Sequence, residues 1–106
     1  MEKTSGRVLL AGFELEEAER AICDNIIKNY SHKINERAEF ENIKIRLRKS
    51  SKGKKVLNEI EASLKAQGQI FTARMTDFNL FSALADAMEK LLNELTHKLR
   101  TSRQNK

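Results

Sequence analysis

The stretch "TDFNLFSALADAMEKLLNEL", from Thr76 to Leu95, changes its hydrophobic period partway along. The residues before it, "QIFTARM" (Gln69–Met75), alternate between apolar and polar side chains, which is the pattern of a half-buried strand. After Asn79 the apolar residues recur every three or four positions, which is the spacing of an amphipathic helix. The chain therefore passes from a strand into a long helix through a few polar residues, and we expect Asp77 or Asn79 to cap the helix.

One side of this second helix is apolar along its whole length. The stripe consists of Leu80, Leu84, Ala87, Met88, Leu91, Leu95 and Leu99, widened by Phe81 and Leu92. A helix with a single apolar stripe must bury it against another apolar surface. We therefore expect the helix to lie as a lid on one face of a sheet.

The rest of the chain supplies that sheet and a first helix. A first strand is expected around Val8–Leu10, bent near Gly12. A helix is expected from about residue 16 to residues 33–36, with Ala18, Ile22, Ile26 and Tyr30 along one side and Ala21 and Ile27 flanking them. A second strand is predicted where Ile43, Ile45 and Leu47 alternate with basic residues. In a third strand Val56, Ile60, Ala62 and Leu64 share one face, although Asn58 interrupts the row without a reason in the sequence.

These elements predict an α+β fold in the order β-α-β-β-β-α. Turns at Gly53 and Gly68 make the last three strands an antiparallel meander, so the expectation is a four-stranded sheet with two helices packed on one face. The expected core contains Ile43, Ile45, Leu47, Ile60, Leu64, Phe71, Leu84, Met88 and Leu91.

Length and composition favour a single compact domain. The chain has 106 residues, no proline and one cysteine, so it has no internal disulfide and fits a reducing compartment. No apolar run approaches the roughly 20 residues of a membrane span, so no membrane partner is expected and the cytoplasm is the default location. We expect one domain over residues 1–106, with a flexible leader (1–6) and tail (101–106).

The net charge of +5 is concentrated in two segments. Residues 44–55, "KIRLRKSSKGKK", contain seven bases and no acid, and the last ten residues contain four bases and no acid. Clustered Lys and Arg indicate a polyanionic partner, because they release counterions when they meet phosphates. The alternative is a solvated hairpin tip and a frayed tail, and charge alone does not decide between the two.

Signals for catalysis or metal binding are weak. His32 and His97 do not form a ligand spacing, and Cys23 has no base within helical reach, which indicates a small buried hydrophobe. Glu59 and Glu61 share a strand face next to a basic strand, so we expect them to form cross-strand ion pairs and not to act as the paired carboxylates of a hydrolase. No glycine-rich phosphate loop occurs. We expect no enzyme activity, no cofactor, no metal and no small-molecule substrate.

The order of elements and the strand-to-helix join resemble those of the ribosome hibernation promoting factor family, also described as ribosome-associated inhibitors or sigma-54 modulation proteins. The resemblance covers about Val8 to Arg100 and is most specific at Gly68, "IFTARM" and then "NLFSAL" from Asn79 to Leu84. It departs at Ala85, where family members often have Asp. The chain is similar to the short form of the family, which lacks a C-terminal dimerisation domain.

This resemblance implies a fold like that of double-stranded RNA-binding domains and a function in translation regulation under stress. Such proteins bind the small ribosomal subunit, through its rRNA, in the channel of messenger and transfer RNA, and they hold idle ribosomes in a protected state. One Tyr and no Trp argue against recognition by base stacking. Two alternatives stay open: a free-standing module that binds structured RNA, and a homo-oligomeric adaptor that self-associates through a sheet edge or face.

Three groups of bases are candidates for RNA binding. We call them the strand row (Lys44, Arg46, Arg48), the turn lysines (Lys52, Lys54, Lys55) and the helix bases (Lys90, Lys98, Arg100, Arg103). The strand row is expected to be partly compensated by Glu59 and Glu61, and the turn lysines would lose side-chain entropy on binding. Lys98, Arg100 and Arg103 are therefore expected to contribute more to binding than the turn lysines. Whether the protein promotes or prevents ribosome dimers is not decided by the sequence.

Overall fold

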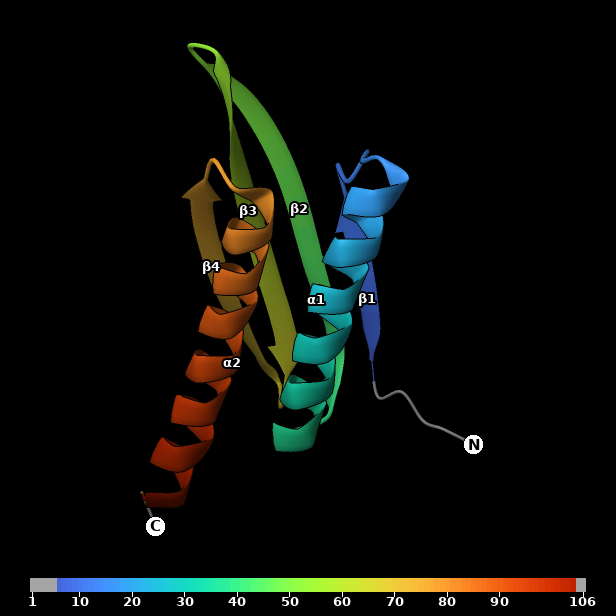
Figure 1. Ribbon diagram of the computed structural model, residues 1–106. Coiled ribbons are helices and arrows are strands. Elements are labelled where there is room, and N and C mark those ends of the chain that lie inside the picture. The colour runs from blue at the N-terminus through green and yellow to red at the C-terminus, as the bar shows by residue number, and fades with distance from the viewer. Residues whose placement is uncertain (1–5, 105–106) are drawn as a thin grey trace.

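The computed structural model describes the backbone of residues 6–104 and the side chains of residues 6–101. Residues 1–5 and 105–106, which make up much of the expected leader and tail, lie outside the described residues. The elements are β1 (Arg7–Ala11), α1 (Glu17–Arg37), β2 (Phe40–Lys52), β3 (Lys55–Ala66), β4 (Gln69–Asp77) and α2 (Leu80–Gln104) (Figure 1). The predicted order β-α-β-β-β-α is confirmed.

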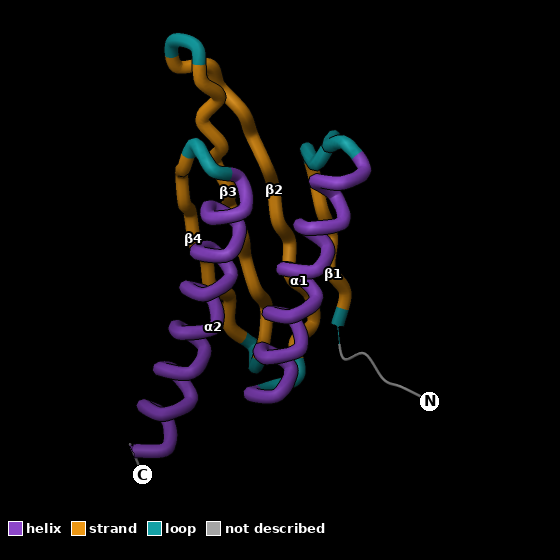
Figure 2. Tube along the Cα trace, viewed as in Figure 1, coloured by secondary structure: helices purple, strands orange, loops and turns teal. Residues whose placement is uncertain are grey.

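The four strands form one sheet in the order β1-β2-β3-β4. β1 is parallel to β2, with Val8 opposite Ile43, because α1 carries the chain back between them; the other two pairs are antiparallel. Both helices lie on the same face of the sheet (Figures 1 and 2). This confirms the predicted two-layer architecture and leaves the opposite face of the sheet without a covering element among the described residues.

The core lies between the sheet and the two helices. All nine expected core residues are at most 9% exposed, and Ile43, Ile60, Leu64, Leu84, Met88 and Leu91 are fully buried. Along α2 the predicted stripe is buried from Leu80 to Leu95, while Phe81 and Leu99 pack against the core from its margin. The second helix is the lid that its hydrophobic period predicts.

The strand-to-helix join is held by three polar side chains. Asn79 caps α2, because its Oδ1 accepts the backbone N–H of Ser82 at 3.0 Å. Asp77 Oδ1 accepts the backbone N–H of Asn79 at 2.9 Å, which forms a local turn. Asn58, which is buried in β3, donates from Nδ2 to the carbonyl oxygens of Asp77 at 3.2 Å and Phe78 at 3.0 Å. The polar interruption in the apolar row of β3 is therefore a tie between β3 and the start of α2.

The buried side of α1 differs from the predicted one. Cys23, Ile27 and Ile34 are buried, whereas Ile22 is exposed and Ile26 and Tyr30 lie at the margin of the core. Because α2 covers β3 and β4, α1 lies beside it and turns a different side toward the core. The Tyr30 hydroxyl donates to Glu89 of α2 at 2.8 Å, and this hydrogen bond is the main cause that raises the pKa of Tyr30.

The β2–β3 hairpin extends beyond the rest of the sheet (Figure 1). β1 ends opposite Arg46, and β4 ends opposite Asn58, so residues 47–52 and 55–57 lack a neighbouring strand on one side. Val56 shares the strand face of Ile60, Ala62 and Leu64, but it is 48% exposed, because it lies beyond the part of β3 that pairs with β4. Gly53, at the tip, has a φ of 67°, as a tight two-residue turn requires.

Candidate nucleic-acid interface

The strand row lies on the uncovered face of the sheet. Lys44, Arg46 and Arg48 alternate with Ile43, Ile45 and Leu47 of β2, so burying the three aliphatic residues under the helices points all three bases outward. Leu9 and Ala11 of β1 lie opposite Lys44 and Arg46 and carry no charge. Within the described part of the chain, no ion pair engages these three bases.

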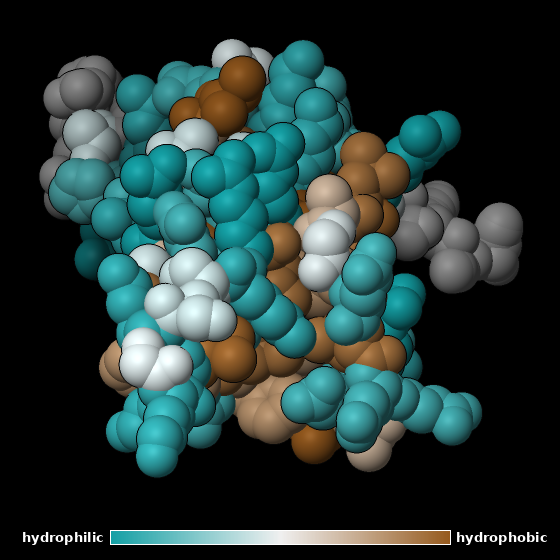
Figure 3. All heavy atoms as spheres, turned by 90° about the horizontal axis from the view of Figure 1, so that it is seen from above, coloured by the Kyte–Doolittle hydropathy of each residue, from teal (hydrophilic) through white to brown (hydrophobic). Residues whose placement is uncertain are grey.

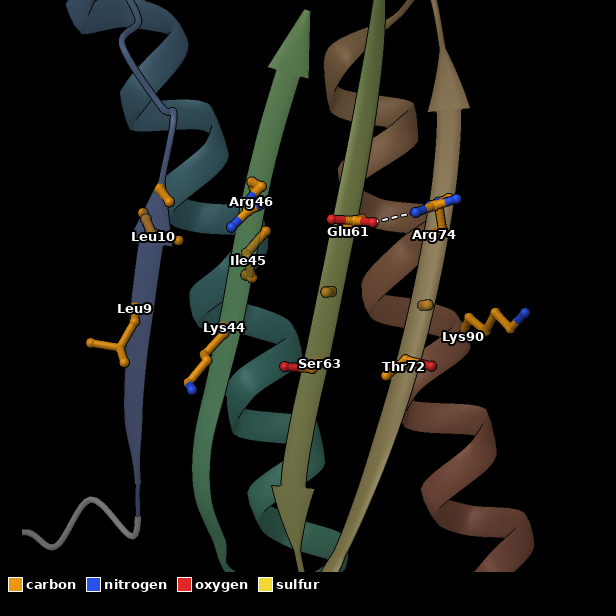
Figure 4. A pocket seen from close by; sticks show the side chains of 13 residues that line it. Leu9, Leu10, Lys44, Ile45, Arg46, Glu61, Ser63, Thr72, Arg74 and Lys90 are labelled. Atoms are coloured by element: carbon orange, nitrogen blue, oxygen red, sulfur yellow. Dashed lines mark hydrogen bonds and ion pairs between the residues drawn. The ribbon is translucent and has the colours of Figure 1, made fainter.

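Arg74 of β4 forms ion pairs with the two glutamates of this face, Glu59 and Glu61. Its guanidinium pairs with Glu59 at 3.2 Å and forms a hydrogen-bonded ion pair with Glu61. The hydrogen bond from Arg74 is the largest of the effects that lower the pKa of Glu61, and Arg48 and Arg46 add a smaller contribution through their charge. In Figure 4 the Glu61 carboxylate turns toward Arg74, while the Arg46 and Lys44 side chains point toward β1.

Cross-strand ion pairing of Glu59 and Glu61 was expected, but the expected partner was wrong. The register places Arg46 opposite Glu61 and Arg48 opposite Glu59, as drawn from the sequence. Glu61 lies between β2 and β4, however, and β4 places Arg74 directly opposite it. The strand row therefore makes no ion pair within the described residues, although Arg46 and Arg48 still act on Glu61 through their charge, and the reason for ranking the row below the helix bases is weakened.

A shallow hollow of about 750 Å³ runs across this face (Figure 4). Lys44 and Arg46 line it on one side, and Arg74 and Lys90 on the other, with Ser63 and Thr72 between them. Lys90 projects from α2 past the edge of β4, so one of the helix bases shares a surface with the strand row (Figure 4). The floor is a strand surface with hydroxyl and basic side chains, which suits an elongated anionic ligand.

The other bases lie near the two ends of the molecule. The turn lysines are exposed at or beside the tip of the β2–β3 hairpin, and Lys98 and Arg100 lie near the C-terminal end of α2, which extends past the sheet (Figure 1). Arg103 lies in α2, but its side chain is outside the described ones. The structure brings Lys44 and Arg46 of the strand row together with Lys90 around one hollow. It keeps the turn lysines apart from Lys98 and Arg100, which lie toward the opposite end of a molecule 53 Å long.

Sequence reasoning missed Arg74 and Phe78. Arg74 alternates with the inward residues Ala73 and Met75, so its outward direction could have been read from the strand period. Phe78 sits outside both the strand and the helix period, and half of its side chain is exposed. Phe78 is one of the exposed large apolar residues, and it lies next to the lysine-rich hairpin, with Lys55 Nζ 5.4 Å from the centroid of its ring.

Two features of the described residues bear on the reactive thiol and the metal site considered from the sequence. Burial raises the pKa of the Cys23 thiol, which disfavours the reactive thiolate. Residues 6–104 contain no cluster of His, Cys, Asp or Glu that could hold a metal ion. No helix in this range is both long and apolar enough to cross a membrane.

No protein-family model matches the sequence, and no match is found among characterised proteins by sequence. The structure, however, resembles a ribosomal subunit interface protein from Coxiella burnetii, with a TM-score of 0.63 and 15% identity, over 89% of this chain and 98% of that one. It also resembles the N-terminal domain of Protein Y from Thermus thermophilus, with a TM-score of 0.58 and 15% identity, over 86% of this chain and 93% of that one. At this identity the likeness shows a shared fold, and it confirms the fold expected from the resemblance to the hibernation factors.

Proposed function

Because the chain shares the fold of a ribosomal subunit interface protein over nearly its whole length, we propose that it is a ribosome-associated inhibitor of translation. It binds rRNA of the small subunit near the channel of messenger and transfer RNA and stabilises idle ribosomes. The observation that carries the proposal is the strand row on an open sheet face, where the two nearby acids, Glu59 and Glu61, are ion-paired with Arg74. No catalytic step is part of this function.

The chemistry of the face suits RNA backbone better than base edges. Three bases two residues apart on one strand present a line of positive charge, because an extended strand advances about 6.6 Å per two residues. Such a line of bases can neutralise several phosphates of an RNA backbone. Such contacts supply affinity and position with little demand on sequence. Lys90 adds a positive charge across the hollow from Lys44 and Arg46.

Sedimentation of cell extract in a sucrose gradient tests the partner. Comigration of the protein with small subunits or whole ribosomes supports the proposal. A light fraction that is sensitive to ribonuclease would point to a free-standing RNA-binding module, and a light fraction that is insensitive would point to a homo-oligomeric adaptor. Either light fraction would contradict a ribosomal role.

A pelleting assay with purified ribosomes tests the surface. The triple variant Lys44→Gln, Arg46→Gln and Arg48→Gln removes the strand row, and the expected result is a loss of binding of about tenfold or more. The matched control is Arg20→Gln, Lys28→Gln and Arg37→Gln, which also removes three positive charges, but from exposed positions of α1. Equal losses in both variants would mean that binding follows net charge and not this face.

A further inference from the structure

Phe78 is an exposed aromatic ring at the end of the molecule where α2 begins. It is 51% exposed, and Val56 of the projecting hairpin, also about half exposed, lines the same hollow of about 610 Å³. Leu80 and Phe81, at the start of α2, line it as well. Figure 3, which looks down on this end, shows hydrophobic atoms at the surface among polar ones. Packing within the fold therefore uses only part of the ring.

The backbone that carries the ring is fixed in place. Asn58 donates a hydrogen bond to the Phe78 carbonyl oxygen at 3.0 Å, and the next residue is the cap of α2. A ring presented from so constrained a backbone has little conformational freedom to lose on binding a partner.

The surroundings of the ring are basic. Lys49 and Lys55 line the hollow with one acid, Glu19, and residues 44–58 contain no acid at all. Lys55 Nζ lies 5.4 Å from the ring centroid, which is a cation–π distance. An aromatic face beside ammonium groups is the combination that proteins use to stack a base while they neutralise its phosphate.

We propose that this hollow binds one unpaired nucleotide of the RNA partner. The base stacks on Phe78 with its edge against Val56, and the phosphate lies between Lys49 and Lys55. The inference rests on the proposed function, since the RNA is taken to be ribosomal, and it adds a single stacking position to an interface otherwise built on backbone contacts. It also revises the expectation that the few aromatic residues exclude stacking. An apolar peptide would fill the same hollow without any use for the lysines around it.

A tryptophan in place of Phe78 tests the stacking directly, because the protein has no other tryptophan. The Phe78→Trp variant is titrated with a short single-stranded oligoribonucleotide and with an abasic oligomer of the same length, and binding of each is followed independently by anisotropy of an end label. At saturation the oligoribonucleotide is expected to quench the tryptophan at least about twofold more than the abasic oligomer does. Ile70→Trp, at the other end of β4 and also exposed, is the control and is expected to show no such difference. Equal quenching by both oligomers, or no quenching at saturation, would overturn the proposal.

Ribosome pelleting separates stacking from apolar packing. Phe78→Leu keeps an apolar side chain and is expected to weaken binding about fivefold or more, whereas Phe78→Tyr keeps the ring and should stay within about twofold of the parent. Both variants are first checked for an unchanged melting temperature. Leucine that binds as well as phenylalanine would indicate a protein partner and contradict stacking. If the parent protein does not pellet with ribosomes while the fluorescence of the Phe78→Trp variant is quenched by the oligoribonucleotide, the ribosomal function fails and the nucleotide site stands.

Discussion

Asn58 occupies a core position of β3, between Val56 and Ile60 on the inward side of the strand. Its buried amide would be costly without partners, but both donor hydrogens are used, on the carbonyl oxygens of Asp77 and Phe78. Those carbonyls belong to the last residue of β4 and to the residue that precedes the cap of α2. One side chain of β3 thus holds the backbone at the point where the chain passes from β4 into α2.

Replacing Asn58 with Ala should lower the free energy of unfolding by about 1–3 kcal/mol, because two carbonyl oxygens lose their donors. Asn58→Asp, which keeps the shape but presents an acceptor, should cost at least as much. Thermal or denaturant melts measure both, with Ser50→Ala, on the exposed part of β2, as the control. A melt of Asn58→Ala that matches this control would show that the tie does not hold the join.

Arg74 and Glu61 form the second interaction that matters at the scale of single residues. Arg74 holds the pKa of Glu61 below its ordinary value, so the pair stabilises the folded state above the unfolded pKa of the carboxyl, and this contribution is lost as the pH falls through the lower folded pKa. Both side chains are exposed to solvent, so the contribution to stability is small.

In Arg74→Gln the pKa of Glu61 should rise toward the ordinary range, since its largest source of stabilisation is removed. A pH titration of the Glu61 side chain followed by NMR measures the shift. Arg7→Gln, an exposed substitution on β1, should leave the titration unchanged. An unchanged pKa in Arg74→Gln would assign the effect to Arg46 and Arg48 instead, and would weaken the argument that the strand row keeps its charge.

At the scale of elements, α2 covers one face of the sheet and the β2–β3 hairpin projects beyond it. α2 covers the sheet with a stripe that is buried from Leu80 to Leu95, and its last turns continue past the sheet (Figure 1). The hairpin leaves the sheet at the opposite end, where β1 and β4 have stopped. Both extensions carry bases, because residues that leave the core have no apolar surface to cover.

Leu84→Ala should lower the free energy of unfolding by about 2–5 kcal/mol, because the side chain is fully buried between α2 and the sheet. The matched control is Leu9→Ala, the same truncation at a site that is 45% exposed on the open face, where the loss should be below half of that value. Denaturant unfolding measures both variants. Equal losses would contradict the assignment of α2 as the covering helix.

At the scale of the whole molecule, positive charge lies along an elongated body. The strand row lies on the open face and Lys90 projects from α2 at its edge, with the turn lysines toward one end of the molecule and Lys98 and Arg100 toward the other. A ligand that meets all three groups must follow the longest dimension of 53 Å, which an RNA surface can do and a small molecule cannot. Self-association through the open face would instead bring like charges together.

Ribosome binding should weaken steeply as the salt concentration rises, because each phosphate contact releases counterions. In the strand-row variant with three glutamines, the slope of log K against log salt should be smaller in magnitude by roughly 2–3, which is the share of three contacts. Pelleting at several salt concentrations gives both slopes. Binding of the parent that does not change with salt would indicate a contact made through ribosomal protein.

The helix bases should contribute more than the turn lysines. Reversal of charge at Lys98, Arg100 and Arg103 is expected to weaken ribosome binding more than reversal at Lys52, Lys54 and Lys55, because a helix presents its side chains from a more rigid backbone than a hairpin tip does. Of the turn lysines, Lys55 alone lines the Phe78 hollow. Pelleting of the two triple variants, each with an unchanged melt, measures the ranking. A larger loss of ribosome binding in the turn variant would contradict this ranking and would indicate that the helix bases mainly interact with the helix dipole.

The sequence by itself determined the order of elements, the face that β2 and α2 bury, and the three groups of bases, because period and charge are local properties of the chain. It did not place the buried side of α1 correctly at Ile22, because the position of α1 beside α2 decides which residues meet the core. It also gave no sign that Val56 is exposed, because strand parity does not say where a neighbouring strand ends. The partner of Glu61 was decided by tertiary structure, since a central strand offers each side chain a neighbour on both sides. The same is true of Asn58, whose acceptors lie on residues 19 and 20 positions away and meet it only when the sheet has formed.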